Sequence, residues 1–259
     1  MGKTMGFDWS KTAEDDHGLR IGLPARLFDV LAARGIGERG QKLVDLGTGV
    51  GQFARDFARR GVEVTAVDAS ETLIEAARRQ SEKQDVRMDY VVAEAERTGL
   101  PAKSFDVVSA AEAWEWFDRP KTIREVKRLL KPAGWLVIVS FDWLPLRGNV
   151  VTATEALIEK YNPEWRWGGG TGIYPEWLRH IRAGGFSDLE TFSFDVTHDY
   201  SHDHWTRRVS SSSAVRASLS PDEVHRFTET LRTALADQFP DEAVPVMHCC
   251  WVISARVPN

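Results

Sequence analysis

Three glycines at alternate positions follow a short apolar run that contains an acid. The run covers residues 43–46, and the acid is Asp45. The glycines are Gly47, Gly49 and Gly51. Glycines suit a backbone that must turn sharply or lie against a ligand without a Cβ in the way. An amphipathic stretch begins at Gln52, so we predict a strand, a tight turn and a helix whose first amides point at a bound group. This pattern indicates a nucleotide-type pocket.

A second apolar run also ends in an acid. Residues 62–68 are predicted to form a strand that ends at Asp68, 23 positions after Asp45. In doubly wound α/β folds, a carboxylate at the tip of the second strand accepts hydrogen bonds from ribose hydroxyls. We therefore predict that Asp68 binds a ribose. Dinucleotide-binding enzymes favour the spacing G-x-G-x-x-G, whereas the third glycine comes one residue early here. A turn of this kind that holds no ligand is the alternative.

The pattern acid-x-Gly-x-Gly-x-Gly followed by a second-strand acid resembles the class I S-adenosylmethionine-dependent methyltransferases. The resemblance implies an α/β fold, a Rossmann-like seven-stranded sheet with helices on both faces and the last strands antiparallel. It implies S-adenosyl-L-methionine as cofactor and S-adenosyl-L-homocysteine as product. The cofactor-binding residues that it implies in this part of the chain are Asp45, Gly47, Thr48, Gly49, Gly51, Asp68 and Ala69.

Further cofactor contacts follow from a similarity to one branch of that family, the trans-aconitate methyltransferase-like or type 11 proteins. That branch carries Tyr-Arg-Pro-x-Tyr-Pro where this chain has residues 19–24, so Arg20 would lie near the carboxylate of the cofactor. The match also implies that Glu94 binds the adenine amino group and that Ala95 offers its backbone amide to the ring. Ala111 completes the set. A solvated Arg20 and an exposed Glu94 at a strand end are the alternatives.

Two acids alternate with tryptophans directly after the fourth predicted strand, where ligands bind in open α/β sheets. They are Glu112, Trp114, Glu115 and Trp116. Relatives in this branch often carry Gln at the first acid and His at the second. Both acids are candidate catalytic residues, because a carboxylate could take a proton from a hydroxyl or bind a cationic amine. The tryptophans either border the substrate or pack a helix onto the sheet.

One domain over residues 1–259 is expected, because a chain of this length with 42% hydrophobic residues can bury a full core. Its expected parts are a cap over the cofactor (1–40), the cofactor-binding core (43–141) and two substrate-side insertions (142–185 and 198–244). In the first insertion, three glycines stand beside two tryptophans. That combination suggests a helical, mobile lid, with a plain connecting loop as the alternative.

Alternating apolar residues predict further strands. The predicted ranges are 86–93, 105–109, 135–141, 186–196 and 246–257. The last contains Cys249 and Cys250, whose side chains would face opposite ways on a strand, so buried thiols are expected rather than a disulfide.

A histidine-rich segment, residues 198–205, opens the second insertion. Its histidines are His198, His202 and His204. They lack a recognised zinc spacing and no cysteine accompanies them, so polar loop residues and no metal site are predicted. Arg207 and Arg208 follow and could hold a substrate carboxylate by bidentate pairing, or be solvated.

Charge and hydropathy limit the kinds of partner that this protein is expected to have. The net charge is −5 and the pI about 5.8, so the chain lacks the basic character of nucleic-acid binders. No apolar run is long enough to span a membrane, and the first residues lack a secretory core or a myristoylation signal. We expect a cytoplasmic protein that acts on a small molecule, without a nucleic-acid or membrane partner. The oligomeric state stays open.

The main functional hypothesis is a methyltransferase that moves the methyl group of S-adenosylmethionine to an oxygen, nitrogen or carbon of a small molecule. Positioning supplies most of the rate of such an in-line displacement, and a base is needed only when the nucleophile arrives protonated. The first alternative is a nicotinamide-dependent oxidoreductase, against which the glycine spacing argues. The second is a non-catalytic module that binds S-adenosylmethionine or S-adenosylhomocysteine.

Overall fold

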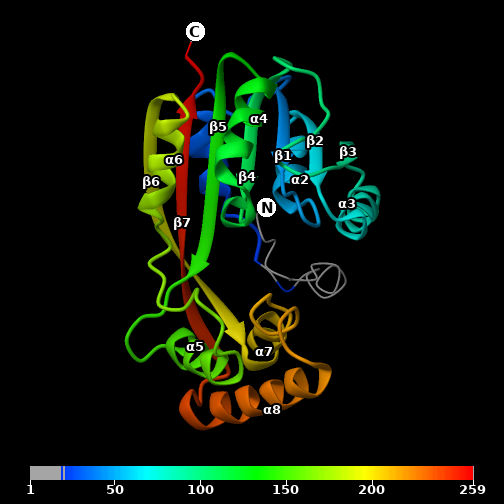
Figure 1. Ribbon diagram of the computed structural model, residues 1–259. Helices are drawn as coiled ribbons and strands as arrows, with labels where there is room; N and C mark the ends of the chain where they lie inside the picture. Colours follow the sequence, from blue (N-terminus) through cyan, green and yellow to red (C-terminus); the bar gives the residue numbers. More distant parts are fainter. Residues whose placement is uncertain (1–18, 20, 259) are drawn as a thin grey trace.

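A single seven-stranded sheet runs through the molecule in the order β3-β2-β1-β4-β5-β7-β6 (Figure 1). The computed structural model describes residue 19 and residues 21–258 of the chain. The strands are β1 (Lys42–Leu46), β2 (Glu63–Asp68), β3 (Asp89–Val92), β4 (Phe105–Ala111), β5 (Leu130–Trp143), β6 (Ser187–Ser201) and β7 (Ala243–Arg256). The first five pair in parallel, whereas β7 is antiparallel to both β5 and β6. The predicted sheet with antiparallel last strands is confirmed.

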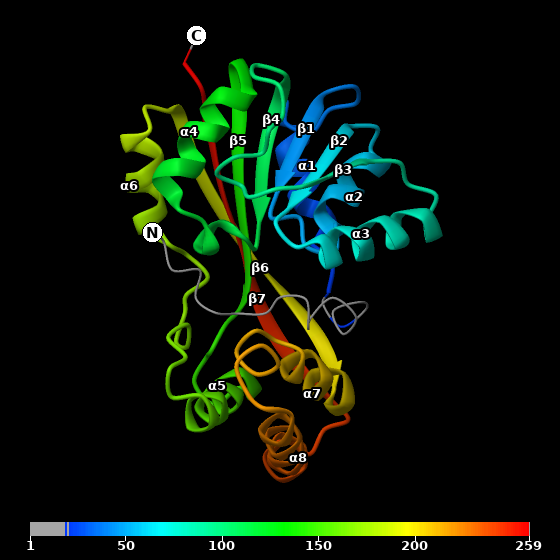
Figure 2. The same cartoon turned by 45° about the vertical axis from the view of Figure 1, so that its right-hand side comes forward.

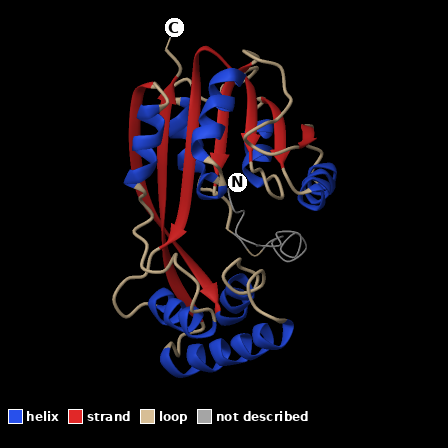
Figure 3. Ribbon diagram, in the orientation of Figure 1, coloured by secondary structure: helices blue, strands red, loops and turns tan. Residues whose placement is uncertain are grey.

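Helices cover both faces of the sheet, as predicted (Figure 3). The helices of the described residues are α1 (Ala25–Ala32), α2 (Gln52–Arg59), α3 (Glu71–Lys83), α4 (Arg119–Leu129), α5 (Val150–Tyr161), α6 (Pro175–Ala183), α7 (His202–Ser210) and α8 (Pro221–Gln238). Apolar side chains of α1 and α2 pack on one face, and those of α4 and α6 pack on the other. None of the helices in the described part of the chain is long and apolar enough to cross a membrane.

The strands β5, β6 and β7 are at least twice as long as the others and extend beyond the parallel part of the sheet (Figure 2). They have 14, 15 and 14 residues, against 4 to 7 in β1 to β4. Their projecting ends meet α5, α7 and α8, which bury a separate apolar cluster around Tyr200, Trp205 and Phe227. We call this part the helical lobe.

The prediction of a polar loop over residues 198–205 is wrong. The strand β6 continues to Ser201, and α7 begins at the next residue. His198 and Tyr200 take the alternate positions that Phe194 and Val196 hold earlier in the strand. The period of two therefore persists, but an imidazole and a phenol replace the apolar side chains of Phe194 and Val196, so the stretch looked polar. The fifth strand is likewise longer than predicted and ends at Trp143, whereas the third covers only residues 89–92.

The two cysteines confirm the period of two in β7. Both are buried free thiols. Cys249 packs in the cluster under α4 and α6, and Cys250 packs in the cluster under α1 and α2. Adjacent side chains on a strand thus serve the two faces of the sheet.

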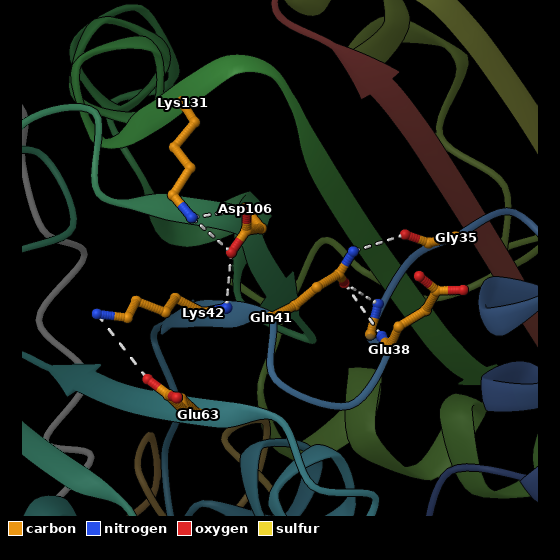
Figure 4. A network of polar contacts seen from close by, with 8 residues as sticks. Gly35, Glu38, Gln41, Lys42, Glu63, Asp106 and Lys131 are labelled. Carbon is orange, nitrogen blue, oxygen red and sulfur yellow. Dashed lines mark hydrogen bonds and ion pairs between the residues drawn. The ribbon is translucent and has the colours of Figure 1, made fainter.

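A network of polar contacts closes the end of the sheet at which β1 and β4 begin (Figure 4). Asp106 accepts hydrogen bonds from the amide of Lys42 at 2.8 Å and from Nζ of Lys131 at 2.8 Å. The side chain of Gln41 donates to the carbonyl of Gly35 at 2.9 Å. Ligands of open α/β sheets bind at the opposite end, where the parallel strands finish, so this network has a structural role.

A buried carboxylate anchors the loop between β3 and β4. One oxygen of Glu125 accepts from the amide and the hydroxyl of Thr98 at 2.9 and 2.6 Å, and the other accepts from Arg128 at 2.7 Å. Burial alone would raise the pKa of Glu125, but the hydrogen bonds from Arg128 and Thr98 outweigh it and lower the pKa to about 2. The charged form is therefore the one that stabilises the fold.

Replacement of Glu125 with Gln should lower the free energy of unfolding at pH 7 by about 2–3 kcal/mol, because the charge-assisted bonds are lost. The pKa is lower in the folded state than its usual 4.5, so this contribution is complete above pH 4.5 and disappears as the pH falls toward 2. Urea denaturation at several pH values should show a smaller acid-induced loss in the variant. Glu229→Gln, which breaks the exposed pair with Arg232, is the control and should cost less than about 0.5 kcal/mol; equal losses in both variants would contradict this account.

Candidate cofactor and acceptor site

The glycine turn between β1 and α2 is confirmed. Gly47, Gly49 and Gly51 have φ angles of +68°, +57° and +76°, and α2 begins at Gln52. A Cβ on Gly47 would lie 2.6 Å from the Cβ of Ala113, so no side chain fits there. A Cβ on Gly49 would have no atom of the described residues within 4 Å. The turn is thus closed against the protein at its first glycine and open at its second, where a ligand can approach the backbone.

Asp45 is buried beneath this turn and is fully engaged with protein hydroxyls. Thr48 donates to its Oδ2 at 2.8 Å, and Ser109 of β4 donates to its Oδ1 at 2.7 Å. Burial raises the pKa of Asp45 to about 6, even though both hydroxyls favour the charged form. Asp45 therefore joins β1, β4 and the turn. Sequence reasoning missed Ser109, although the pairing of Asp45 with Ser109 follows once β4 is placed beside β1.

Asp68 ends β2 and connects the tip of that strand to the glycine turn. Its Oδ2 accepts from the amide of Gly49 and its Oδ1 from the amide of Ser70, both at 2.9 Å. Burial raises the pKa of this carboxyl, and the backbone amides oppose the shift. Each carboxylate oxygen can accept a second hydrogen bond. Asp68 is only half-buried, so it keeps the capacity to bind ribose hydroxyls beside Gly49.

The other predicted cofactor residues lie at the same edge, where β2, β3 and β4 finish. Ala69 follows Asp68 and is exposed. Glu94 is exposed and Ala95 is buried in the loop after β3, which the bond from the amide of Ala93 to the carbonyl of Asp68 ties to β2 at 3.0 Å. Ala111 is the last residue of β4 and is half-buried. Arg20 lies outside the described residues.

Glu112 fastens the end of β4 to β5. Its amide donates to the carbonyl of Val139 at 2.9 Å, and its side chain accepts from the amide of Phe141. The residue has a φ of +54°, a conformation that costs a side-chain-bearing residue about 1–2 kcal/mol. The backbone is therefore held in an unfavourable conformation next to the open edge, a feature common at functional sites.

The tryptophans on either side of Glu115 have different surroundings. Trp114 is fully buried and packs edge-on against Phe117. Trp116 contacts Trp167, which lies between α5 and α6, with a distance of 5.4 Å between ring centroids. Glu115 itself belongs to the short 3-10 turn Trp114–Trp116. One tryptophan is thus core, and the other meets the predicted lid insertion.

A phenol and a carboxylate that were not predicted stand beside these acids. The hydroxyl of Tyr174 donates to Oδ2 of Asp142 at 2.6 Å, and that oxygen also accepts from Ser140 at 2.7 Å. Burial raises the pKa of Tyr174, and the charges of Asp142, Glu112 and Glu115 raise it further. The end of β5 therefore shares a carboxylate-rich environment with the end of β4. The position of Asp142 directly after the apolar run of β5 was the signal that could have identified it.

Comparison with known proteins gives a consistent result. Residues 44–138 match the family model described as a methyltransferase domain. The chain is 30% identical over 216 residues to 27-O-demethylrifamycin SV methyltransferase of Amycolatopsis mediterranei, with 80% of this chain and 75% of the relative covered. It is 28% identical over 196 residues to the ubiquinone biosynthesis O-methyltransferase of Xanthomonas oryzae, with 73% and 77% covered.

Among solved structures, a putative type II methyltransferase from Anaeromyxobacter dehalogenans superposes with a TM-score of 0.64 at 25% identity, over 93% of this chain and 99% of that one. The strand order, the glycine turn and these matches agree. The chain belongs to the class I S-adenosylmethionine-dependent methyltransferases that act on small molecules.

Proposed function

We propose that this protein binds S-adenosyl-L-methionine at the glycine turn and catalyses transfer of its methyl group to an oxygen of a small molecule. The observation that carries the cofactor assignment is the open face of Gly49 beside the carboxylate of Asp68. That arrangement offers a backbone surface without side chains and a hydrogen-bond acceptor for ribose hydroxyls. Oxygen is favoured as the acceptor atom because the Xanthomonas relative is named an O-methyltransferase and the Amycolatopsis relative is named for a 27-O-demethyl substrate.

Each residue group at the edge where β2, β3 and β4 finish has a separate role in cofactor binding. Asp68 binds the ribose, Glu94 and Ala95 bind the adenine, and Ala69 and Ala111 border the ring. Asp45 and Thr48 act through the turn that they hold in place. The bound cofactor supplies an electrophilic methyl group, and S-adenosyl-L-homocysteine is the product.

Either Glu112 or Glu115 takes the proton of the acceptor hydroxyl as the new carbon–oxygen bond forms. The two acids lie on the edge between β4 and the 3-10 turn. Glu112 also accepts a hydrogen bond from the amide of Phe141, so it positions β5 as well. Residues 1–40 are proposed to cap the cofactor, and residues 142–185 and 198–244 to bind the acceptor. A cytoplasmic location fits a small-molecule acceptor.

Calorimetric titration with S-adenosylhomocysteine, with NAD as the comparison, tests the cofactor assignment. Micromolar binding of the first and no binding of the second would support it. The reverse result would move the protein to the oxidoreductases and leave the fold unaffected.

Alanine at Asp68 should weaken binding of S-adenosylhomocysteine by about 2–4 kcal/mol, or about 30- to 1,000-fold, through loss of one or two charge-assisted hydrogen bonds. Asp106→Ala is a matched control. Asp106 also accepts from a backbone amide, that of Lys42, but at the opposite end of the sheet, so its loss should change stability and leave affinity intact. Unchanged affinity in Asp68→Ala would refute the ribose assignment.

Alanine at Gly49 should abolish most cofactor binding at a small cost in stability. The added Cβ would meet no atom of the described residues within 4 Å, so we expect it to clash with the bound ligand, while the positive φ costs about 1 kcal/mol. Gly40→Ala has the same kind of backbone strain, with a φ of +83° and, in the part of the chain that the structure describes, no atom within 4 Å of its Cβ, and should bind normally. If the two variants lose affinity equally, the loss comes from strain and the open face has no role in binding.

A further inference from the structure

Residues 19–24, which we call the N-terminal strap, connect the helical lobe to the glycine turn. Ile21 packs against the apolar cluster of the lobe. A Cβ on Gly22 would lie 3.0 Å from Nε2 of Gln52, the first residue of α2. Leu23 then packs in the cluster under α1 and α2. The strap therefore contacts both the lobe and the helix that begins at the proposed cofactor site.

His204 of α7 holds the start of this strap. Its Nε2 lies 3.0 Å from the carbonyl oxygen of Leu19, although 185 positions separate the two residues. A carbonyl oxygen can only accept, so Nε2 carries the proton and donates. The described residues of the strap belong to no helix or strand. Their conformation therefore depends on contacts with other elements, of which this hydrogen bond is one.

The imidazole of His204 is itself fixed within the helical lobe. The amide of His204 donates to Oγ of Ser201, the residue that caps α7, at 3.2 Å. The ring packs edge-on against Tyr200 and His198, at centroid distances of 4.9 and 6.4 Å. The donor is thus held in place by the lobe, and the strap is the partner that gains order from the bond.

The strap carries one charged residue, Arg20. Arg20 lies outside the described residues, but both of its neighbours are fixed to the lobe, Leu19 by the bond from His204 and Ile21 by packing. The methionine half of S-adenosylmethionine carries a carboxylate. A guanidinium suits a carboxylate because it can donate two parallel hydrogen bonds. The chain on either side of a cation is therefore held between the lobe and the turn at which we propose that the cofactor binds.

We propose that His204 is a positioning residue for the cofactor. Through its hydrogen bond to Leu19 it holds the N-terminal strap beside the glycine turn, where Arg20 pairs with the carboxylate of S-adenosylmethionine. A tether that exists before the cofactor arrives reduces the ordering that binding would otherwise have to bring about. The inference rests on the proposed function, and it concerns the methionine half of the cofactor, whereas Asp68 concerns the ribose.

Two ligands that differ in the amino-acid half test this role. Calorimetry would compare S-adenosylhomocysteine with methylthioadenosine, which keeps the adenosine and the sulfur but lacks the carboxylate. His204→Phe keeps a ring against Tyr200 and removes the donor. We expect its affinity for S-adenosylhomocysteine to fall about tenfold or more, and its affinity for methylthioadenosine to change less than about twofold. Equal losses for both ligands, or no loss for the first, overturn the inference. If the unmodified protein binds neither ligand, the proposed function fails instead.

His248→Phe is the matched control. The ring of His248 also lies next to Tyr200, with centroids 6.1 Å apart, and its Nδ1 is 3.1 Å from a main-chain carbonyl oxygen, that of Val246. That contact stays within β7, so its loss should change stability and leave the affinity for both ligands intact. A selective loss of S-adenosylhomocysteine binding in His248→Phe would trace the effect to disturbed packing around Tyr200 and would overturn the role of His204.

A variant of the strap itself tests the same role without a change in the helical lobe. Arg20→Ala should lose affinity for S-adenosylhomocysteine and keep that for methylthioadenosine. Because His204 acts through Arg20, His204→Phe added to Arg20→Ala should weaken binding no further. Full affinity in Arg20→Ala, or losses that add in the double variant, contradict the proposed positioning.

Discussion

The buried carboxylate of Asp45 is the constraint on which the site is built. A charge without solvent must be hydrogen-bonded, and here one hydroxyl comes from the glycine turn and the other from β4. Meeting that requirement fixes the turn relative to the central strands. Asp68 then joins the same turn to β2 through the amide of Gly49. The backbone at the ligand edge is thus preorganised by two acids that stabilise the fold and shape the pocket together.

A second constraint is the length of the antiparallel strands. Because β5, β6 and β7 continue past the parallel strands, they carry the helical lobe under the cofactor edge. The side chains differ between the strand ends and the projecting part of the sheet. Carboxylates surround Tyr174 at the ends of β4 and β5. Imidazoles and Arg208 lie on the other face of the sheet, beside α7.

The part of the fold that repeats a local rule was predictable from sequence. Glycine spacing and a strand-end acid gave the turn and Asp68, and alternation gave the antiparallel strands, since those signals are short-range. Contacts between residues far apart in the sequence could not be predicted. Ser109 meets Asp45 only through the register of β1 with β4, and Tyr174 meets Asp142 across 32 positions. The histidine segment was predicted wrongly as a loop because His198, Asp199 and the following polar residues hid the alternation of the strand, in which His198 and Tyr200 continue the face of Phe194 and Val196.

The uninterrupted pairing of β6 with β7 limits how the molecule can admit a substrate. After a register shift between Ser187 and Glu190, these strands pair without a break from Glu190 and Ser254 in one half to Ser201 and Ala243 in the other. A hinge between the halves would have to break that ladder, since strands bend and twist but do not fold open. We therefore expect a substrate to enter through movement of side segments, such as the stretch around Trp167, and not through a hinge in the sheet. The contact of Trp167 with Trp116 would then limit the rate of substrate exchange, and the distance between the glycine turn and the helical lobe would stay constant during turnover.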